Sequence, residues 1–144
     1  MVSFSLCMIV KDEEAVLSRC LDSLHDIMDE IIIVDTGSTD KTKEIARKYT
    51  DKIFDYKWCN DFADARNFAA SKATGDYIYT ADADEYLDAE NRDKLCQLKK
   101  IMLPEIEIVQ MLYHTPAGLS TVYNFEEEYR PKLYKRLRTF SWID

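Results

Sequence analysis

Glycine and proline are both scarce in this sequence of 144 residues, which contains three of each. Flexible linkers are rich in glycine or serine, and no stretch here has that composition or a low-complexity pattern. The length is that of about one domain. Hydrophobic residues make up 47% of the chain and charged residues 32%, so the chain can bury a core. We therefore expect a single domain spanning residues 1–144.

Basic residues are outnumbered as well, with 19 Lys and Arg against 27 Asp and Glu and a net charge of −8. Phosphate contacts need a basic face, so we do not expect a nucleic acid as partner. One local exception lies near the C-terminus. We interpret it as a solvated strand edge, where Lys and Arg discourage pairing with other strands; an anion or acceptor contact is the alternative. The basic residues there are Arg130, Lys132, Lys135, Arg136 and Arg138.

Cysteine pairs of the CxxC type are absent and only two histidines are present, so a zinc site is not expected. Cys7, Cys20 and Cys96 lie in apolar patterns and are interpreted as small buried hydrophobes. This usage favours reduced thiols and a cytoplasmic location over disulfides. The apolar run over residues 2–10 is too short for a membrane span and lacks the basic leader of a signal peptide.

Apolar runs of strand length alternate with helical patterns in the first half of the chain. The run EIIIVDT is typical of a parallel strand covered on both faces. Such alternation predicts an α/β fold with a doubly wound, mostly parallel sheet and right-handed crossovers. Asp12 is expected to cap the first helix, and Ser38 or Thr39 the second. The expected strands are 3–10, 30–36, 52–56 and 77–81, and the third helix is 61–73, with Phe62, Ala69 and Ala73 facing inward.

The alternation changes after Asp88. Residues 91–102 predict a helix that ends before Pro104. The three segments that follow alternate apolar with polar residues, which predicts antiparallel or mixed strands in the C-terminal part. These segments are 107–114, 120–125 and 132–140.

An acidic cluster directly follows the expected strand 77–81. Close carboxylates repel one another and are costly to desolvate, so a positive charge should accompany them or they should turn into water. Residues two apart on an extended chain point to the same side, so Asp82 and Asp84 can present their carboxylates together. Such oxygen pairs bind Mg²⁺ or Mn²⁺, often with a diphosphate. The alternative is a solvated, inert loop in which Asp88 caps the next helix.

Two further residues lie close to strand ends, where open α/β sheets bind ligands. Asp35 ends the second expected strand, and Arg66 lies in the helix that precedes the fourth. Arg66 adds a cation that could contact a base or a phosphate. The alternatives are that Asp35 caps the turn at Gly37 and that Arg66 pairs with Asp64 or another acid on its helix.

Three segments together resemble the GT-A glycosyltransferases of family 2 in their order and spacing: SLCMIVKDEEAVLSRCLDSL, DEIIIVDTGSTDKTKEIA and DFADARNFAASKATGDYIYTADADEYL. The resemblance covers about residues 3–88. The ending RPKLYKRLRTFSWID is similar to SunS-like members of that family. The resemblance implies a GT-A-like fold in which 1–88 is the Rossmann-like nucleotide-binding half and 89–144 is the start of an acceptor half, expected to be truncated.

The resemblance also implies roles for the matching residues on the nucleotide. Asp35 would hydrogen-bond a uridine-type base, and Arg66 would contact the base or the phosphates. Val10 and Lys11 would supply backbone contacts to the nucleoside. Asp82 would lie near both the ribose and the metal.

The resemblance implies that Asp84 binds the metal directly and that Asp82 lies beside it, with Mn²⁺ or Mg²⁺ as the cofactor. The implied reaction is transfer of a sugar from a UDP-sugar to a glycan, lipid or protein acceptor, with inversion. An inverting transferase needs a base for the acceptor hydroxyl, and no residue here matches one. The groups available are His114, Glu126, Glu127, Glu128 and Asp144. We therefore expect the chain to bind its donor better than it transfers sugar.

Other functions fit the sequence less well. A sugar-nucleotide pyrophosphorylase should carry a glycine-rich basic loop after its first strand, where this chain has KDEE. A response-regulator receiver could use Asp12, Glu13 and Asp55, but it also needs a late strand-end lysine that we do not find. The serious alternative is a nucleotide-binding or interaction domain without catalysis.

Overall fold

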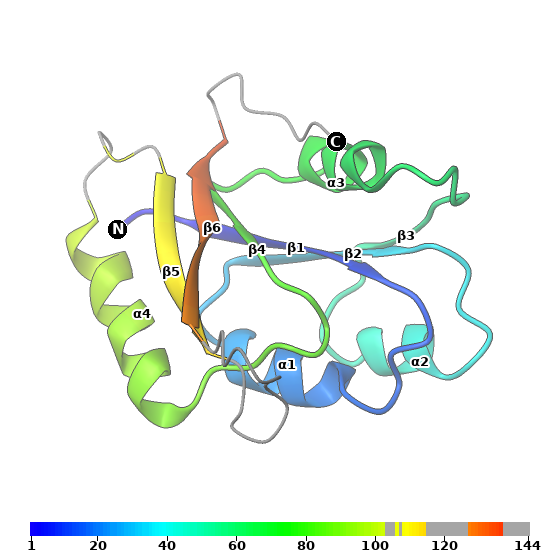
Figure 1. Cartoon of the computed structure of the whole chain (residues 1–144), viewed down its shortest axis with the longest axis horizontal. Helices are drawn as coiled ribbons and strands as arrows, with labels where there is room; N and C mark the ends of the chain where they lie inside the picture. The colour runs from blue at the N-terminus through cyan, green and yellow to red at the C-terminus, as the bar shows by residue number, and fades with distance from the viewer. Residues whose placement is uncertain (103–105, 107, 115–126, 137–144) are drawn as a thin grey trace.

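The computed structural model describes residues 1–102, 106, 108–114 and 127–136. Within them, the strands form one six-stranded sheet in the order β3-β2-β1-β4-β6-β5 (Figure 1). The strands are β1 (Phe4–Val10), β2 (Glu30–Asp35), β3 (Ile53–Asp55), β4 (Tyr77–Thr80), β5 (Ile108–His114) and β6 (Glu127–Lys135). The helices are α1 (Leu17–Leu24), α2 (Thr42–Ala46), α3 (Phe62–Ser71) and α4 (Ala89–Ile101).

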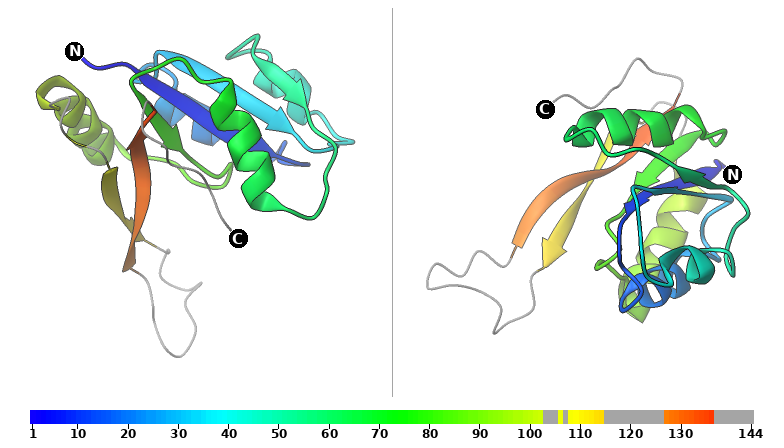
Figure 2. Two further views of the ribbon diagram at one scale, coloured as in Figure 1. Left: turned by 90° about the horizontal axis from the view of Figure 1, so that it is seen from above. Right: turned by 90° about the vertical axis from the view of Figure 1, so that its right-hand side faces the viewer.

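The first four strands form the predicted parallel, doubly wound sheet. β1 pairs in parallel with both β2 and β4, and β3 pairs in parallel with β2. Side chains along β1 alternate between the two faces: Leu6 and Met8 join the core beside α1, whereas Cys7 packs in the smaller cluster beside α3. Figure 2 shows the sheet between α3 on one face and α1 and α2 on the other. Coverage of both faces explains why β1 and β2 are apolar along most of their length.

The C-terminal strands are antiparallel, as predicted. β6 pairs with β4, so that Ile78 lies opposite Tyr134, and β5 completes the sheet beside β6 with a register shift between Val109 and Gln110. The expected strand 120–125 and residues 137–140 of the last expected strand lie outside the described residues. β6 begins at Glu127, earlier than the predicted start at residue 132.

The interpretation of the basic cluster as a solvated strand edge is wrong for Lys132. β6 lies between β4 and β5 and is therefore not an edge strand. Lys132 is buried, and its ammonium group is paired with the carboxylate of Glu85. A further member of the cluster, Arg136, donates from Nε to the Gly75 carbonyl. The sequence pattern missed this because the acid that neutralises Lys132 lies far away along the chain.

The predicted caps of the first two helices are also wrong. α1 begins only at Leu17, after Val16, whose side chain has no capping group. Asp12 instead has a left-handed backbone, with φ of 52°, and its carboxylate accepts from Thr39 N–H. α2 begins at Thr42, whose N–H donates to Asp40 Oδ1. Partners on a neighbouring loop have displaced the local capping pattern.

The inner face of α3 is smaller than predicted. Ala69 and Ala73 are buried as expected, but Phe62 is 59% exposed and packs edge-on against Trp58. Asp61 caps the helix by accepting from Asp64 N–H at 3.1 Å. An alanine-rich helix lies close to the sheet, which leaves a large first-turn side chain outside the interface.

All four cysteines are free thiols. Cys7 and Cys20 are buried as predicted, whereas Cys96 is only half-buried and Cys59 is exposed. Burial is the main cause that raises the thiol pKa of Cys7 and of Cys20 to about 12, so both stay protonated at neutral pH. Among the described helices, none has the length and apolar character that crossing a membrane requires.

A polar network closes the amino ends of the strands. Ser5 Oγ and Thr74 N–H each donate to Glu30 Oε1 at 2.8 Å, and Lys52 pairs with the other oxygen. Gly75 N–H donates to Ser5 Oγ, and a Cβ at Gly75 would lie 2.6 Å from that hydroxyl. Burial raises the pKa of Glu30, but the hydrogen bonds from Lys52, Thr74 and Ser5 outweigh it and lower the pKa to about 2.

We expect Glu30→Gln to destabilise the fold in a pH-dependent way. A carboxyl pKa lowered from 4.5 to about 2 contributes stability that is fully present above pH 4.5 and is lost as the pH falls toward 2. At pH 7 the variant should lose roughly 1–3 kcal/mol of unfolding free energy, measured by urea titration. The difference from wild type should shrink at pH 2.5.

Glu90→Gln is the matched control, since Glu90 forms an exposed pair with Lys94 on α4. It should change the unfolding free energy by less than about 0.5 kcal/mol at either pH. An equal loss for Glu30→Gln at pH 7 and pH 2.5 would contradict the role given to the Glu30 carboxylate.

Candidate functional site

The candidate site lies at the carboxyl ends of the parallel strands. Val10 and Asp35 are register partners at the ends of β1 and β2. The Val10 carbonyl accepts from Thr36 N–H at 3.0 Å and from Thr36 Oγ1 at 3.3 Å. Lys11, the next residue, is exposed. The chain therefore leaves both strands with its backbone held at a defined position.

Reciprocal hydrogen bonds join the loop after β1 to the loop after β2. Asp12 N–H donates to Ser38 Oγ at 2.9 Å, and Thr39 N–H donates back to Asp12 Oδ1 at 2.7 Å. Glu13 N–H donates to the hydroxyl of the buried Thr42 at 2.8 Å. Each loop thus supplies both donors and acceptors, and the two are held as one unit.

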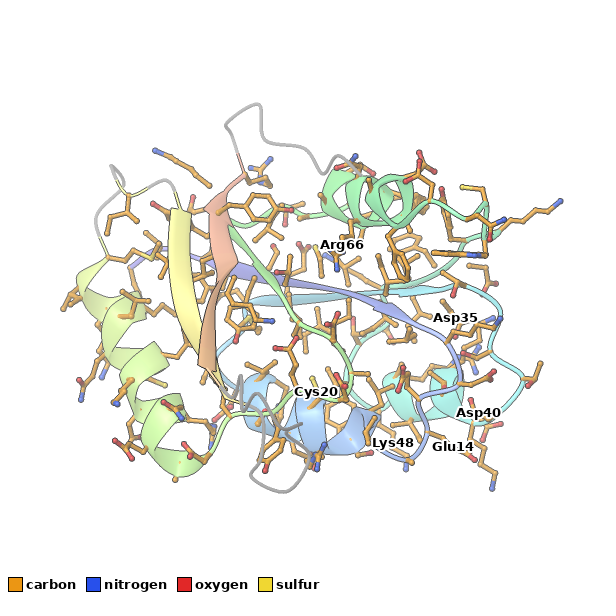
Figure 3. The ribbon with its side chains drawn as sticks, viewed as in Figure 1. Glu14, Cys20, Asp35, Asp40, Lys48 and Arg66 are labelled. Atoms are coloured by element: carbon orange, nitrogen blue, oxygen red, sulfur yellow. The ribbon has the colours of Figure 1, made fainter. Side chains whose placement is uncertain are left out.

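The same two loops meet again at Glu14 and Asp40, which lie near each other in Figure 3. Lys41 N–H donates to Glu14 Oε2 at 3.1 Å, and Glu14 N–H donates to Asp40 Oδ2 at 3.3 Å. These contacts occupy the carboxylates of Glu14 and Asp40 with backbone donors. They make both residues structural members of the loop pair.

Asp35 is 2% exposed and uses its two oxygens differently. Oδ1 accepts from Gly37 N–H at 2.9 Å and from Ser38 N–H at 2.8 Å, so the expected turn cap is present. Gly37 has φ of 118°, a conformation that glycine adopts readily. Oδ2 is buried and has no hydrogen-bond partner among the described residues. A buried acceptor without a donor costs about 1–3 kcal/mol.

The loop after β4 directs two carboxylates out of the core. Asp82 and Asp84 are exposed, while Ala83 between them is buried. Ala83 and Asp84 lie in a turn and not in the expected extended segment, and Glu85 N–H donates to the Asp82 carbonyl at 3.0 Å across it. Asp88 does cap α4, by accepting from Asn91 N–H at 2.9 Å. The cap and the exposed pair are thus separate features of one loop.

Charge at this edge is dominated by acids. Partial burial raises the pKa of Glu13, and the charges of Asp84, Asp82, Asp40 and Asp12 raise it further, in that order. Carboxylates from three loops therefore face one region. Among the residues that the structure describes, no three His, Cys, Asp or Glu side chains are arranged to hold a metal ion by themselves. A cation bound here would take further ligands from water or from a bound molecule.

A cavity of about 220 Å³ lies on the α3 side of the sheet. Arg66 and Phe62 line it from α3, Asp82 from the loop after β4, and Lys132 and Tyr134 from β6. Figure 3 shows Arg66 between α3 and the sheet. The predicted residues Arg66 and Asp82 thus share one cavity. Phe62 and Lys132 were not predicted as site residues, because each contributes only through the tertiary structure.

Asp35 lies apart from that cavity lining. β1 separates β2 from β4 in the sheet, so Asp35 at the end of β2 and Asp82 after β4 belong to strands that are two positions apart, or about 10 Å. Of the expected base candidates, Glu126 and Asp144 lie outside the described residues. His114 and Glu127 are register partners at the joined ends of β5 and β6.

A mostly parallel sheet whose strand ends carry polar loops is the architecture of nucleotide-binding α/β proteins. The family model of Glycosyl transferase family 2 matches residues 5–140, and the chain belongs to this family. A TPR repeat-containing protein of Synechococcus elongatus is 50% identical over 90 residues, which are 62% of this chain and 22% of that protein.

The SPbeta prophage-derived glycosyltransferase SunS of Bacillus subtilis is 38% identical over 96 residues, which are 65% of this chain and 23% of SunS. The chain thus spans about a quarter of the length of these relatives.

Solved structures show the same fold. Glucosyl-3-phosphoglycerate synthase of Mycobacterium tuberculosis in complex with UDP has a TM-score of 0.64 at 19% identity, covering 80% of this chain and 46% of the synthase. The complex of this synthase with Mn²⁺ and UDP-glucose has a TM-score of 0.52 at 22% identity, and the match covers 59% of this chain and 34% of the synthase. S. aureus TarS in complex with UDP-GlcNAc has a TM-score of 0.58 at 22% identity, and the match covers 83% of this chain and 36% of TarS. The fold of this chain is therefore GT-A.

Proposed function

We propose that this chain is the donor-binding part of a glycosyltransferase that transfers a sugar from a UDP-sugar to an acceptor, with inversion and with help from a divalent metal. The observation that carries the proposal is the buried Oδ2 of Asp35, which lacks a partner among the described residues. It lies at the same sheet edge as the exposed pair Asp82 and Asp84, in a chain of family 2.

Asp35 is the proposed contact for the nucleotide base. Its Oδ2 accepts from the imide N–H of uracil, while Oδ1 keeps its two bonds to the turn at Gly37. Because the Val10 carbonyl already accepts from Thr36, the backbone contacts proposed for Val10 and Lys11 fall mainly to Lys11. Arg66, on the cavity that it shares with Asp82, contacts the base or the phosphates.

Asp82 and Asp84 are the proposed metal ligands, with Asp82 also near the ribose. Their exposed carboxylates fit Mn²⁺ or Mg²⁺ when diphosphate oxygens complete the shell, which is how Mg²⁺ is commonly bound. The bound metal would neutralise charge on the leaving diphosphate. The complex of the structural neighbour with Mn²⁺ and UDP-glucose supports this choice of cofactor.

The metal proposal predicts a combined effect on melting temperature. UDP with Mn²⁺ should raise the melting temperature more than UDP alone; a ligand at a hundredfold excess over Kd stabilises the native state by about 2.7 kcal/mol. Asp84→Asn should remove the Mn²⁺-dependent part of this shift and leave the effect of UDP alone. Asp93→Asn, an exposed position on α4, should behave like wild type. Equal shifts with and without Mn²⁺ would exclude the metal role.

The role of Asp35 predicts a preference between bases. Cytosine lacks the imide N–H, so CDP should leave Oδ2 without its donor and bind roughly 10–100-fold more weakly than UDP. Asp35→Asn should reduce or reverse this preference, because an amide can donate to cytosine. Isothermal titration calorimetry measures all four affinities. Equal wild-type affinity for UDP and CDP would remove Asp35 from this role.

Turnover separates an enzyme from a domain that only binds nucleotides. With Mn²⁺ and UDP-glucose, UDP-galactose or UDP-GlcNAc, we expect UDP release that Asp84→Asn abolishes. The rate should lie below the usual range of about 1–10³ s⁻¹, because no acceptor base is assigned and such a base contributes about 10²–10⁴-fold. UDP binding without any release above the Asp84→Asn background would favour the non-catalytic alternative.

A further inference from the structure

A buried ion pair connects β6 to the loop after β4. Lys132 Nζ lies 2.7 Å from Glu85 Oε1 and 2.6 Å from Oε2, and the two side chains are only 11% and 12% exposed. The same ammonium group lies 6.0 Å from the centre of the Tyr79 ring. The pair joins residues that are 47 positions apart in the sequence.

Burying two charges is costly, and a buried ion pair seldom stabilises a fold more than apolar residues would. This pair is therefore better explained by what it holds in place. Glu85 Oε1 also accepts from Asp82 N–H at 2.7 Å, and Glu85 N–H donates to the Asp82 carbonyl at 3.0 Å. The thiol of Cys20 on α1 contacts that carbonyl at 3.7 Å. The backbone of Asp82 is thus fixed through both its N–H and its carbonyl.

We propose that Lys132 and Glu85 are positioning residues that hold the carboxylates of Asp82 and Asp84 in the orientation that binds the metal and the diphosphate. This inference rests on the function proposed above. The Lys132 ammonium group pairs with both oxygens of Glu85, and this pairing keeps Oε1 directed at Asp82 N–H. A strand from the C-terminal part of the sheet therefore sets the geometry of the loop that follows β4.

Loss of the lysine charge has a defined consequence. In Lys132→Met the methylene stem is largely kept, but Glu85 is left as a buried carboxylate without its cation. Glu85 then turns toward water, and Asp82 N–H loses its acceptor. The loop becomes free to separate the two exposed carboxylates. Lys132→Arg keeps the charge and can still reach Glu85, so it should restore most of the wild-type behaviour.

Lys99→Met is the matched control. Lys99 is buried to the same extent as Lys132, at 11% exposure, and its Nζ pairs with Asp29 at 2.7 Å. It also donates to the Ile27 carbonyl at 2.7 Å. Asp29 lies just before β2, at the end of the sheet opposite to Asp82. The control therefore removes an equally buried lysine charge without touching the loop after β4.

Two measurements test the proposal. Calorimetric titration of Mn²⁺ into the UDP-saturated protein should show affinity about 10–100-fold weaker for Lys132→Met than for wild type, the range typical of groups that orient metal ligands. Lys99→Met should match wild type, and Lys132→Arg should lie closer to wild type than Lys132→Met does. UDP affinity in EDTA should be similar in Lys99→Met and wild type. Hydrogen exchange without ligands should show faster exchange of the Asp82 amide in Lys132→Met only.

The outcomes separate the two proposals. Unchanged Mn²⁺ affinity and unchanged Asp82 exchange in Lys132→Met would overturn the positioning role and leave the proposed function standing. Equal weakening in Lys99→Met would also overturn it, because general destabilisation would then explain the effect. A wild-type protein that binds UDP but no Mn²⁺ would overturn the metal-assisted function, and the positioning role with it.

Discussion

The parallel pairing of β1 with both β2 and β4 is the constraint on which the rest of the structure depends. Parallel strands end at the same edge of a sheet, so Asp35 at the end of β2 and Asp82 after β4 must both lie near the end of β1. The same pairing places helices over both faces, since each crossover has to return the chain to its starting edge. Side chains of the strands can then meet water or a ligand only at the strand ends, where Asp35, Asp82 and Asp84 lie.

Both ends of the parallel strands carry carboxylates, but the charges around them are arranged differently. At the amino ends, Glu30 is neutralised by Lys52 and satisfied by donors from Ser5 and Thr74, so the network is complete within the protein. At the carboxyl ends, acids face one another, and the pKa of Glu13 is raised by burial and by its neighbours. The carboxylate at the amino ends of the strands is neutralised by a lysine, whereas the acids around Glu13 at the carboxyl ends repel one another. This difference in charge balance distinguishes the candidate site from the structural network.

At the candidate site, contacts between loops add to the caps that Asp61 and Asp88 supply to α3 and α4. Asp12 accepts from Thr39 N–H, and the buried Thr42 accepts from Glu13 N–H. The loop after β4 is secured differently, by the ion pair between Glu85 and Lys132. The loops after β1 and β2 are thus held by each other, whereas the loop after β4 is held by β6.

Much of the fold followed from local pattern alone. The apolar runs of β1 to β4 were identified to within about two residues, because buried parallel strands have no polar face to obscure them. The C-terminal part was predicted from its alternation as antiparallel or mixed strands, and its described strands, β5 and β6, pair antiparallel. Among the site residues, Asp82 and Asp84 were recognisable as acids directly after a buried strand, although the structure places Ala83 and Asp84 in a turn and not in the expected extended segment.

Only the tertiary structure decided the features that depend on partners distant in sequence. Asp12 is of a residue type that often caps helices, but its carboxylate accepts from Thr39 N–H on another loop. The sequence predicts a solvated Lys132, but this residue is buried and paired with Glu85. The two oxygens of Asp35 cannot be told apart in sequence, yet one is satisfied by a turn and the other is left without a partner among the described residues. The sequence by itself determined which backbone segments are strands and which acids follow them, since hydrophobic periodicity is local. Charge neutralisation and hydrogen-bond satisfaction are not local, because they depend on which distant groups the fold brings within about 3 Å.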